Sequence, residues 1–235
     1  MLGTITNTIT IIVGSVVGAV LKRGIKPQYQ GALFTAMGLA SLALGFNAVA
    51  RTMPKSEYPV LFVVSLAVGA LFGTVLDIDG RFKRLVARLE KADNAGADAS
   101  SSSLAKGLTT GILLYCIGTF SIVGPMLSAL EGDNTFLFTN ATLDLITSAV
   151  LAATYGIGMA WAAPVLFCWQ GSFYMIAKFF GPVIPDALVN EIITVGGTLI
   201  VASGLSLLNI KDCRSLNLLP ALLVPVLFFL LKGLF

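Results

Sequence analysis

The sequence has 235 residues, of which 56% are hydrophobic and only 11% are charged, and its mean hydropathy is +0.90. This composition excludes an ordinary soluble domain and indicates a protein that lies in a lipid bilayer. The 15 Lys and Arg residues are dispersed around apolar runs and nearly balanced by 12 Asp and Glu, so nucleic acid is a poor partner. Histidine is absent, which excludes His-based triads and His metal sites. The three cysteines have no C-x-x-C spacing, and we interpret them as packing residues.

The first apolar run, 2–21, predicts a retained membrane helix. Its basic residues Lys22, Arg23 and Lys26 follow the run, whereas a cleavable signal carries its positive charge before the apolar stretch. Seven further runs approach the length of about 20 residues that spans a bilayer. They are 32–50, 58–76, 104–130, 141–161, 163–180, 187–210 and 216–235. The sequence therefore predicts an all-α, polytopic transmembrane bundle of about eight spans.

The span count has one alternative, which concerns the stretch from 141 to 180. Only residues 162–164 could turn the chain there, and Gln170 and Gly171 interrupt the following run. Seven spans and a re-entrant segment are the alternative. With eight spans and a periplasmic N-terminus, most Lys and Arg residues fall in cytoplasmic segments, as the positive-inside rule requires. We therefore expect that orientation.

The long hydrophilic segment 77–106 divides the single membrane domain, 1–235, into two parts. Its first half predicts a cytoplasmic amphipathic helix that lies on an anionic leaflet. On one face of this helix are four apolar residues, Phe82, Leu85, Val86 and Leu89, and the basic residues lie on the opposite face. A solvated extension of the third span is the alternative. The serine-rich stretch 94–103 predicts a flexible linker. The sequence therefore predicts a three-helix front part, 1–76, and a back part of about five helices, 107–235.

Small residues recur four apart along three of the runs. The pairs and triplets are Gly14/Gly18, Ser65/Gly69/Gly73 and Gly107/Gly111. Such stripes let helix backbones approach closely within lipid. We expect contacts inside the monomer, with a homo-oligomer seam as the alternative.

Proline and glycine weaken the fourth span. Gly118, Gly124 and Pro125 disfavour a regular helix, while the hydroxyls of Thr119 and Ser121 offer replacement hydrogen bonds. The pattern predicts either a break between residues 118 and 125, whose backbone groups could bind an ion or solute, or a simple kink.

Two carboxylates, Asp144 and Glu191, fall inside or at the edge of apolar runs. A central Asp costs about 2.5–3.5 kcal/mol on insertion scales, so such groups are paired, hydrated or functional. With eight spans, both carboxylates collect in the outer half of the bilayer together with Asn7 and Gly124, while Gln170 lies deeper. The plain alternative is that each acid occupies the first turn of its helix and complements the helix dipole.

Signatures of known enzymes are missing from the sequence. It contains no Walker motif, no Gly-x-Ser-x-Gly elbow, no His-Glu-x-x-His and no dinucleotide fingerprint. We therefore expect no catalytic residues, no cofactor and no metal.

Several motifs occur in an order that resembles a known family. They are the stretch 115–124, Leu137-Phe138-Thr139, Leu143-Asp144, Gly156-Ile157-Gly158, Gln170-Gly171 and the stretch 218–222. Over nearly its whole length the chain resembles the YqgA/YdfK-like family of prokaryotic inner-membrane proteins, whose function is unknown. The resemblance implies several spans and a bacterial inner-membrane location. Family members commonly show Lys and Ser shortly before the motif that ends in Asp144, at the places where the chain has Asn140 and Ala141.

These patterns predict a secondary transporter or channel-like protein for a small solute or cation, with the bilayer as its surroundings. Its pathway would be lined by Asn7, Ser121, Gly124, Asp144, Gln170 and Glu191. Asp144 would serve as the charge or proton-coupling site. The alternative is a non-transporting membrane scaffold or partner-binding subunit.

Overall fold

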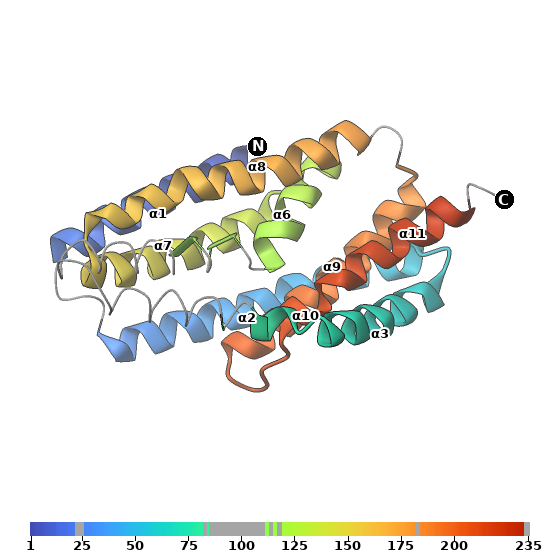
Figure 1. Ribbon diagram of the computed structural model, residues 1–235, viewed down its shortest axis with the longest axis horizontal. Coiled ribbons are helices and arrows are strands. Elements are labelled where there is room, and N and C mark those ends of the chain that lie inside the picture. Colours follow the sequence, from blue (N-terminus) through green and yellow to red (C-terminus); the bar gives the residue numbers. More distant parts are fainter. Residues whose placement is uncertain are drawn as a thin grey trace. The chain divides into compact units, whose positions relative to one another are not determined.

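The computed structural model describes residues 1–21, 26–81, 84, 111–112, 115–116, 119–181 and 184–232. Within these ranges the chain is helical and contains no strand, which confirms the all-α prediction (Figure 1). Most of the predicted amphipathic helix and the whole serine-rich linker lie outside the described residues.

Six helical segments in the described ranges are long and apolar enough to cross a membrane. They are Leu2–Leu21, Gly31–Lys55, Pro59–Arg81, Thr135–Ala153, Asp186–Leu207 and Ser215–Lys232. Helix α8, Ala162–Phe180, continues through Gln170 and Gly171 without interruption, but it does not reach the same apolar standard. Helix α6, Thr119–Leu130, has only 12 residues. Six spans are thus supported by length and composition, and the total of eight stays a prediction.

Helix α7, Thr135–Tyr155, begins six residues before the predicted run and ends earlier than it. Its start is fixed by Asp133, whose Oδ1 accepts the backbone N–H of Thr135 at 2.9 Å. It ends because Gly156 takes a φ of +89°, a left-handed conformation that other residues rarely adopt. The 3-10 helix η3, Ile157–Trp161, then leads into α8, so the expectation that only residues 162–164 turn the chain was wrong.

The chain forms two compact units, and each takes segments from both the front and the back of the sequence. Unit 1 comprises 1–34 and 81–178, and unit 2 comprises 35–80 and 179–235. The contacts within each unit, rather than the order along the chain, therefore define the surroundings of each polar residue.

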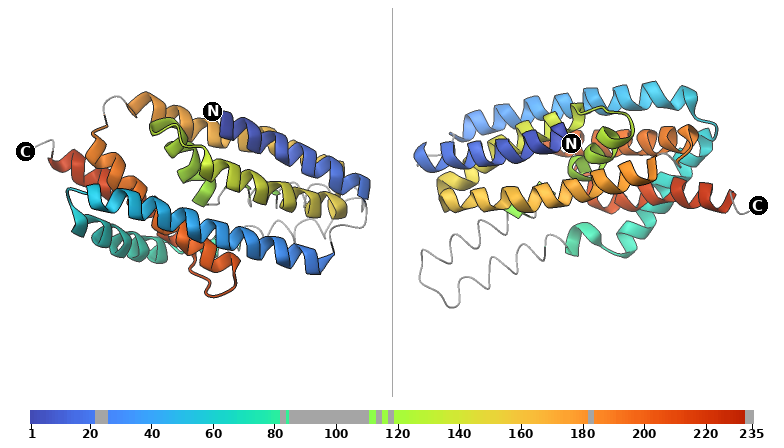
Figure 2. Two further views of the ribbon diagram at one scale, coloured as in Figure 1. Left: turned by 180° about the vertical axis from the view of Figure 1, so that it is seen from behind. Right: turned by 90° about the horizontal axis from the view of Figure 1, so that it is seen from above.

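In unit 1, helix α1, Leu2–Leu21, packs along α7, as the two views of Figure 2 also show. The buried stripe of α1 includes Gly3, Asn7, Ile11, Gly14 and Gly18. The spacing of three or four residues puts all of them on one helix face. Small residues there let Asn7 reach the neighbouring helix.

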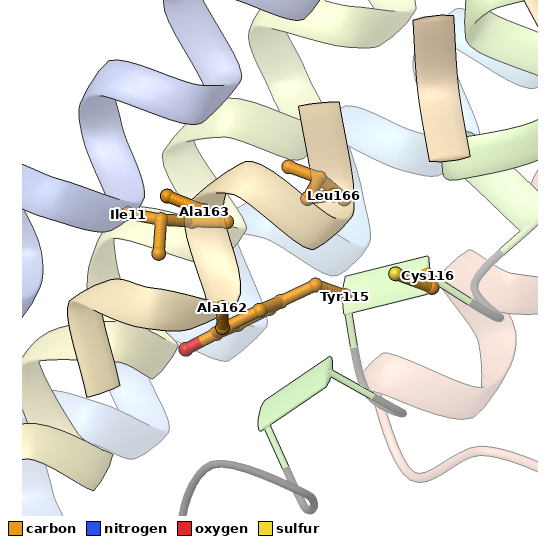
Figure 3. Packing of buried hydrophobic residues seen from close by; sticks show 6 residues of the cluster. All are labelled: Ile11, Tyr115, Cys116, Ala162, Ala163 and Leu166. Atoms are coloured by element: carbon orange, nitrogen blue, oxygen red, sulfur yellow. The ribbon is translucent and has the colours of Figure 1, made fainter. Parts of the chain in front are cut away.

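An apolar cluster in unit 1 joins α1 to α8 and to the described residues before α6. It consists of Ile11, Tyr115, Cys116, Ala162, Ala163 and Leu166, and Figure 3 shows the ring of Tyr115 extending toward Ala162. Cys116 is buried in this cluster, as expected for a packing residue. The cluster holds the chain segment whose carbonyl at Tyr115 contributes to the polar site.

In unit 2, glycines again set the helix contacts. Gly45 of α2, Pro27–Thr52, meets Gly197 and Val201 of α9, Asp186–Leu207. Helix α3, Pro59–Val75, lies with Gly69 against Ala221 of the 3-10 helix η5, Leu219–Leu222. The glycine stripes that the structure describes thus pack inside the chain.

The last predicted span of unit 2 is built from three short pieces. The four-residue helix α10, Ser215–Leu218, is followed by η5 and by α11, Leu223–Lys232. Pro220 and Pro225 lack the N–H groups that a continuous helix would need. Between α2 and α3 a further 3-10 helix, η1, covers Met53–Lys55.

Candidate functional site: a buried carboxylate held by amides

Asp144 lies in the middle of α7 and not at its end. It is the tenth of the 21 residues of that helix and only 6% exposed. The alternative that Asp144 complements the dipole in a first helical turn was therefore wrong. The sequence placed the helix start near Asp144 because the preceding stretch is polar, yet that stretch is helical and its Asn140 faces the protein interior.

Two amide side chains hold the carboxylate of Asp144. The Nδ2 of Asn7, on α1, donates to Oδ2 of Asp144 at 2.9 Å. The Nδ2 of Asn140 donates to the same oxygen, also at 2.9 Å. Asn140 lies one turn before Asp144 on α7. One donor to this oxygen therefore comes from the same helix and the other, Asn7, from a neighbouring helix.

Ser121 of α6 connects this pair to α8. Its hydroxyl donates to the carbonyl of Tyr115 and accepts N–H groups from Asn140 and from Gln170, each at 3.2 Å. Because a hydroxyl has one hydrogen and two lone pairs, these three contacts use its full capacity. They also fix the amide orientation of Asn140, whose two N–H bonds point to Ser121 and Asp144.

Gln170 carries a buried acceptor of this network that no donor satisfies in the part of the chain that the structure describes. Gln170 is fully buried, and its Oε1 has no hydrogen-bond partner among the residues that the structure describes. A buried acceptor without a donor costs about 1–3 kcal/mol. An N–H or O–H group of a bound solute or water could satisfy it.

The donors to Asp144 are all neutral. In the described part of the chain, no Lys or Arg side chain forms a salt bridge with this carboxylate, and only amide N–H groups donate to it. Inside a membrane bundle an ionised carboxylate without a counter-charge is expensive. The site is therefore suited to hold a proton or a cation.

Gly124 and Pro125 lie within α6, which runs without interruption from Thr119 to Leu130. A break at these two residues is thus not present, while Gly118 lies outside the described ranges. A Cβ at Gly124 would sit 3.1 Å from side-chain atoms of Leu137, so this glycine brings α6 close to α7. Pro125 cannot donate to the carbonyl of Ser121, because it has no N–H.

Glu191 belongs to unit 2, where it has its own partners. It is the sixth residue of α9, beyond the first turn that Asp186 occupies, and it is fully buried. Its Oε1 accepts the hydroxyl of Ser56 and, at 3.3 Å, the backbone N–H of Tyr58. Of the six predicted site residues, Asn7, Ser121, Asp144 and Gln170 thus form one hydrogen-bonded network with Asn140 in unit 1.

Asn140 is the site residue that the sequence analysis missed. A usable signal was present, because residues four apart on a helix share a face and Asn140 precedes Asp144 by four. The polar character of the stretch before Ala141 instead suggested a segment outside the membrane.

Replacing Ser121 by Ala should destabilise the protein, because the N–H groups of Asn140 and Gln170 would lose a buried acceptor. We expect a loss of about 1–3 kcal/mol. The matched control is Ser172→Ala on the exposed face of α8, where the hydroxyl donates only to its own helix. That change should stay within about 0.5 kcal/mol. Thermal unfolding in detergent measures both, and equal melting temperatures for the two variants would contradict the network.

The apolar helices and the polar network buried among them define a multi-spanning α-helical membrane protein. A model of the family described as "Protein of unknown function (DUF554)" matches residues 2–230, and the chain belongs to this family.

Two relatives are similar along almost their entire length. The chain is 52% identical to "Uncharacterized membrane protein YdfK" of Bacillus subtilis (strain 168), covering 96% of this chain and 94% of the relative. It is 25% identical to "Uncharacterized protein YqgA" of Escherichia coli (strain K12), covering 96% and 95%. The family predicted from the motifs is thereby confirmed. No solved structure matches the chain.

Proposed function

We propose that the protein is a secondary transporter or channel-like protein for a small solute or cation, with Asp144 as its charge or proton-coupling site. One observation carries the proposal: a buried carboxylate in the middle of an apolar helix has neutral amide donors and, among the residues that the structure describes, no basic partner. Ionisable groups at such depth are costly and typically mark ion or proton pathways.

The hydrogen-bond pattern supports a carboxylate that alternates between two states. Two N–H donors on Oδ2 stabilise the ionised form while the site is empty. Binding of a proton or cation then removes the uncompensated charge. Because Asn7 lies on α1 and Asn140 on α7, a change in charge at Asp144 alters the contact between these helices, which gives the coupling a structural route.

The other residues of the network would line the pathway. Gln170 offers an acceptor for an N–H or O–H group of the solute, Ser121 positions Gln170 and Asn140, and Gly124 brings α6 close enough to α7. The bacterial relatives support a bacterial inner membrane as the location. The distribution of basic residues over eight spans favours a periplasmic N-terminus. Glu191 belongs to unit 2, where its carboxylate contacts Ser56 and Tyr58.

The test is a flux assay in proteoliposomes that compares the wild type with Asp144→Asn. Loss of flux in the variant supports the proposal, and equal flux removes Asp144 from the mechanism. If the wild type carries none of the tested ions or amines, the transporter proposal fails. The alternative function, a non-transporting membrane scaffold or partner-binding subunit, is then favoured.

A further inference from the structure

A second buried polar cluster lies in unit 2, where the end of α2 and the following loop meet α9. It comprises Thr52, Ser56, Thr194 and Glu191, and all but Ser56 are at most 1% exposed. Thr194 follows Glu191 by three residues, so both lie on one face of α9, about 4.5 Å apart along the helix axis. The hydroxyls of Thr194 and Thr52 are hydrogen-bonded to each other, and Glu191 accepts the hydroxyl of Ser56, so two neighbouring contacts join α9 to the segment around the end of α2.

The carboxylate of Glu191 is only half satisfied. Its Oε1 accepts the hydroxyl of Ser56 and the backbone N–H of Tyr58. Its Oε2 is buried and has no hydrogen-bond partner within the described ranges. The ammonium of Lys232 contacts the hydroxyl and ring of Tyr58 rather than the carboxylate, and the side chains of Arg51 and Lys55 are exposed.

The hydroxyls of Thr52 and Thr194, one helical turn from Glu191 along α9, have fewer hydrogens than hydrogen-bond contacts. Thr52 Oγ1 lies 2.8 Å from the carbonyl of Ala48, Thr194 Oγ1 lies 2.8 Å from that of Asn190, and the two hydroxyl oxygens are 2.7 Å apart. Three close oxygen–oxygen contacts share two hydrogens, because each hydroxyl carries one. One contact therefore always lacks a hydrogen, and the cluster has surplus lone pairs.

The local field adds to this excess of acceptors. Helix α2 ends at Thr52, and the C-terminal end of a helix carries partial negative charge. The positive end of α9 is complemented by Asp186 in its first turn. The two threonine hydroxyls thus lie at the negative end of α2 and one helical turn from Glu191 on α9.

We infer that Glu191, Thr52, Thr194 and Ser56 form a binding site for a monovalent hard cation such as Na⁺. A proton on Oε2 would neutralise the carboxylate but create a buried donor without an acceptor. A cation satisfies the free oxygen, the surplus lone pairs and the charge together, and oxygen atoms are the ligands that hard cations prefer. One carboxylate matches one positive charge. This site goes beyond the proposed role of Asp144 and does not depend on it.

The experiment measures binding of ²²Na⁺ to the purified full-length protein in detergent, together with its melting temperature in NaCl and in choline chloride of equal ionic strength. We expect saturable binding and a melting temperature that rises with Na⁺, because a ligand that binds only the folded state stabilises it. Asp186→Asn, which changes an exposed acid in the first turn of the same helix as Glu191, should bind Na⁺ and melt like the wild type. Binding and melting are both measured without any flux, so their outcome is separable from that of the flux assay.

Two variants test the assignment of the ligands. Glu191→Gln keeps an oxygen for Ser56 and Tyr58 but removes the charge, and it should abolish Na⁺ binding. Thr194→Val keeps the shape of the side chain without the hydroxyl, and it should weaken binding roughly tenfold, as loss of a metal-site contact typically does. If Glu191→Gln fails to fold, Thr194→Val decides. The inference would be overturned if the melting temperature of the wild type did not depend on Na⁺. It would also be overturned if both variants bound Na⁺ as the wild type does.

Discussion

Asp144→Asn should lower ion or solute flux into proteoliposomes by about a hundredfold or more, because an amide cannot take up a proton or neutralise a cation. The assay follows H⁺ with the trapped dye pyranine and uses ²²Na⁺, ⁸⁶Rb⁺ and labelled methylammonium as further probes. Flux is compared at equal protein content in vesicles of one lipid composition, with and without an imposed membrane potential.

The substitution separates charge from structure. Asn7 and Asn140 both donate to Oδ2 of Asp144, so the single oxygen of an asparagine can accept both bonds. We therefore expect the variant to fold with a melting temperature close to that of the wild type. A loss of flux then reports the missing carboxylate rather than a damaged bundle.

Asp186→Asn is the matched control, since it makes the same chemical change at an exposed position in the first turn of α9. This variant should retain wild-type flux. Equal losses in both variants would contradict a specific role of Asp144.

Gly18→Ala should destabilise the protein by about 2 kcal/mol or more, because it forces apart α1 and α7. A Cβ at Gly18 would lie 2.1 Å from the backbone oxygen of Ala149 and 2.8 Å from its carbonyl carbon. Backbone atoms cannot move aside as a flexible side chain could, so the two helices must separate. The clash outweighs the roughly 1 kcal/mol that Ala gains over Gly in a helix.

Gly171→Ala in α8 provides the control for Gly18→Ala. A Cβ at Gly171 would meet nothing within 4 Å, so only the gain in helix propensity remains. We expect unchanged or slightly higher stability, by about 0.5–1 kcal/mol. Both variants are compared by thermal unfolding in the same detergent. If Gly18→Ala melts at the wild-type temperature, the close approach of α1 and α7 is wrong.

The sequence could predict features that depend on neighbouring residues along the chain. Apolar runs of sufficient length indicated membrane helices, and the glycine spacing of Gly14 and Gly18 indicated a close helix contact. Asp144 and Glu191 stood out because a carboxylate within an apolar run is costly in any fold that buries it. The order of motifs was enough to indicate the family.

Helix ends were harder to predict from the sequence, because the sequence does not show whether a polar residue lies inside a helix bundle or in water. The stretch Thr139-Asn140-Ala141-Thr142 is largely polar, yet it lies within α7, which begins at Thr135. Hydropathy therefore placed Asp144 near a helix end, although it lies in the middle.

The partners of the two carboxylates were decided by tertiary structure alone. Asn7 is 137 residues from Asp144 in the chain, and Ser56 is 135 residues from Glu191. No local spacing relates such residues, because only the packing of whole helices brings them together. The same packing gives Asp144 two side-chain amide donors and gives Glu191 a hydroxyl and a backbone N–H, a chemical difference between two acids that the sequence presents as equivalent.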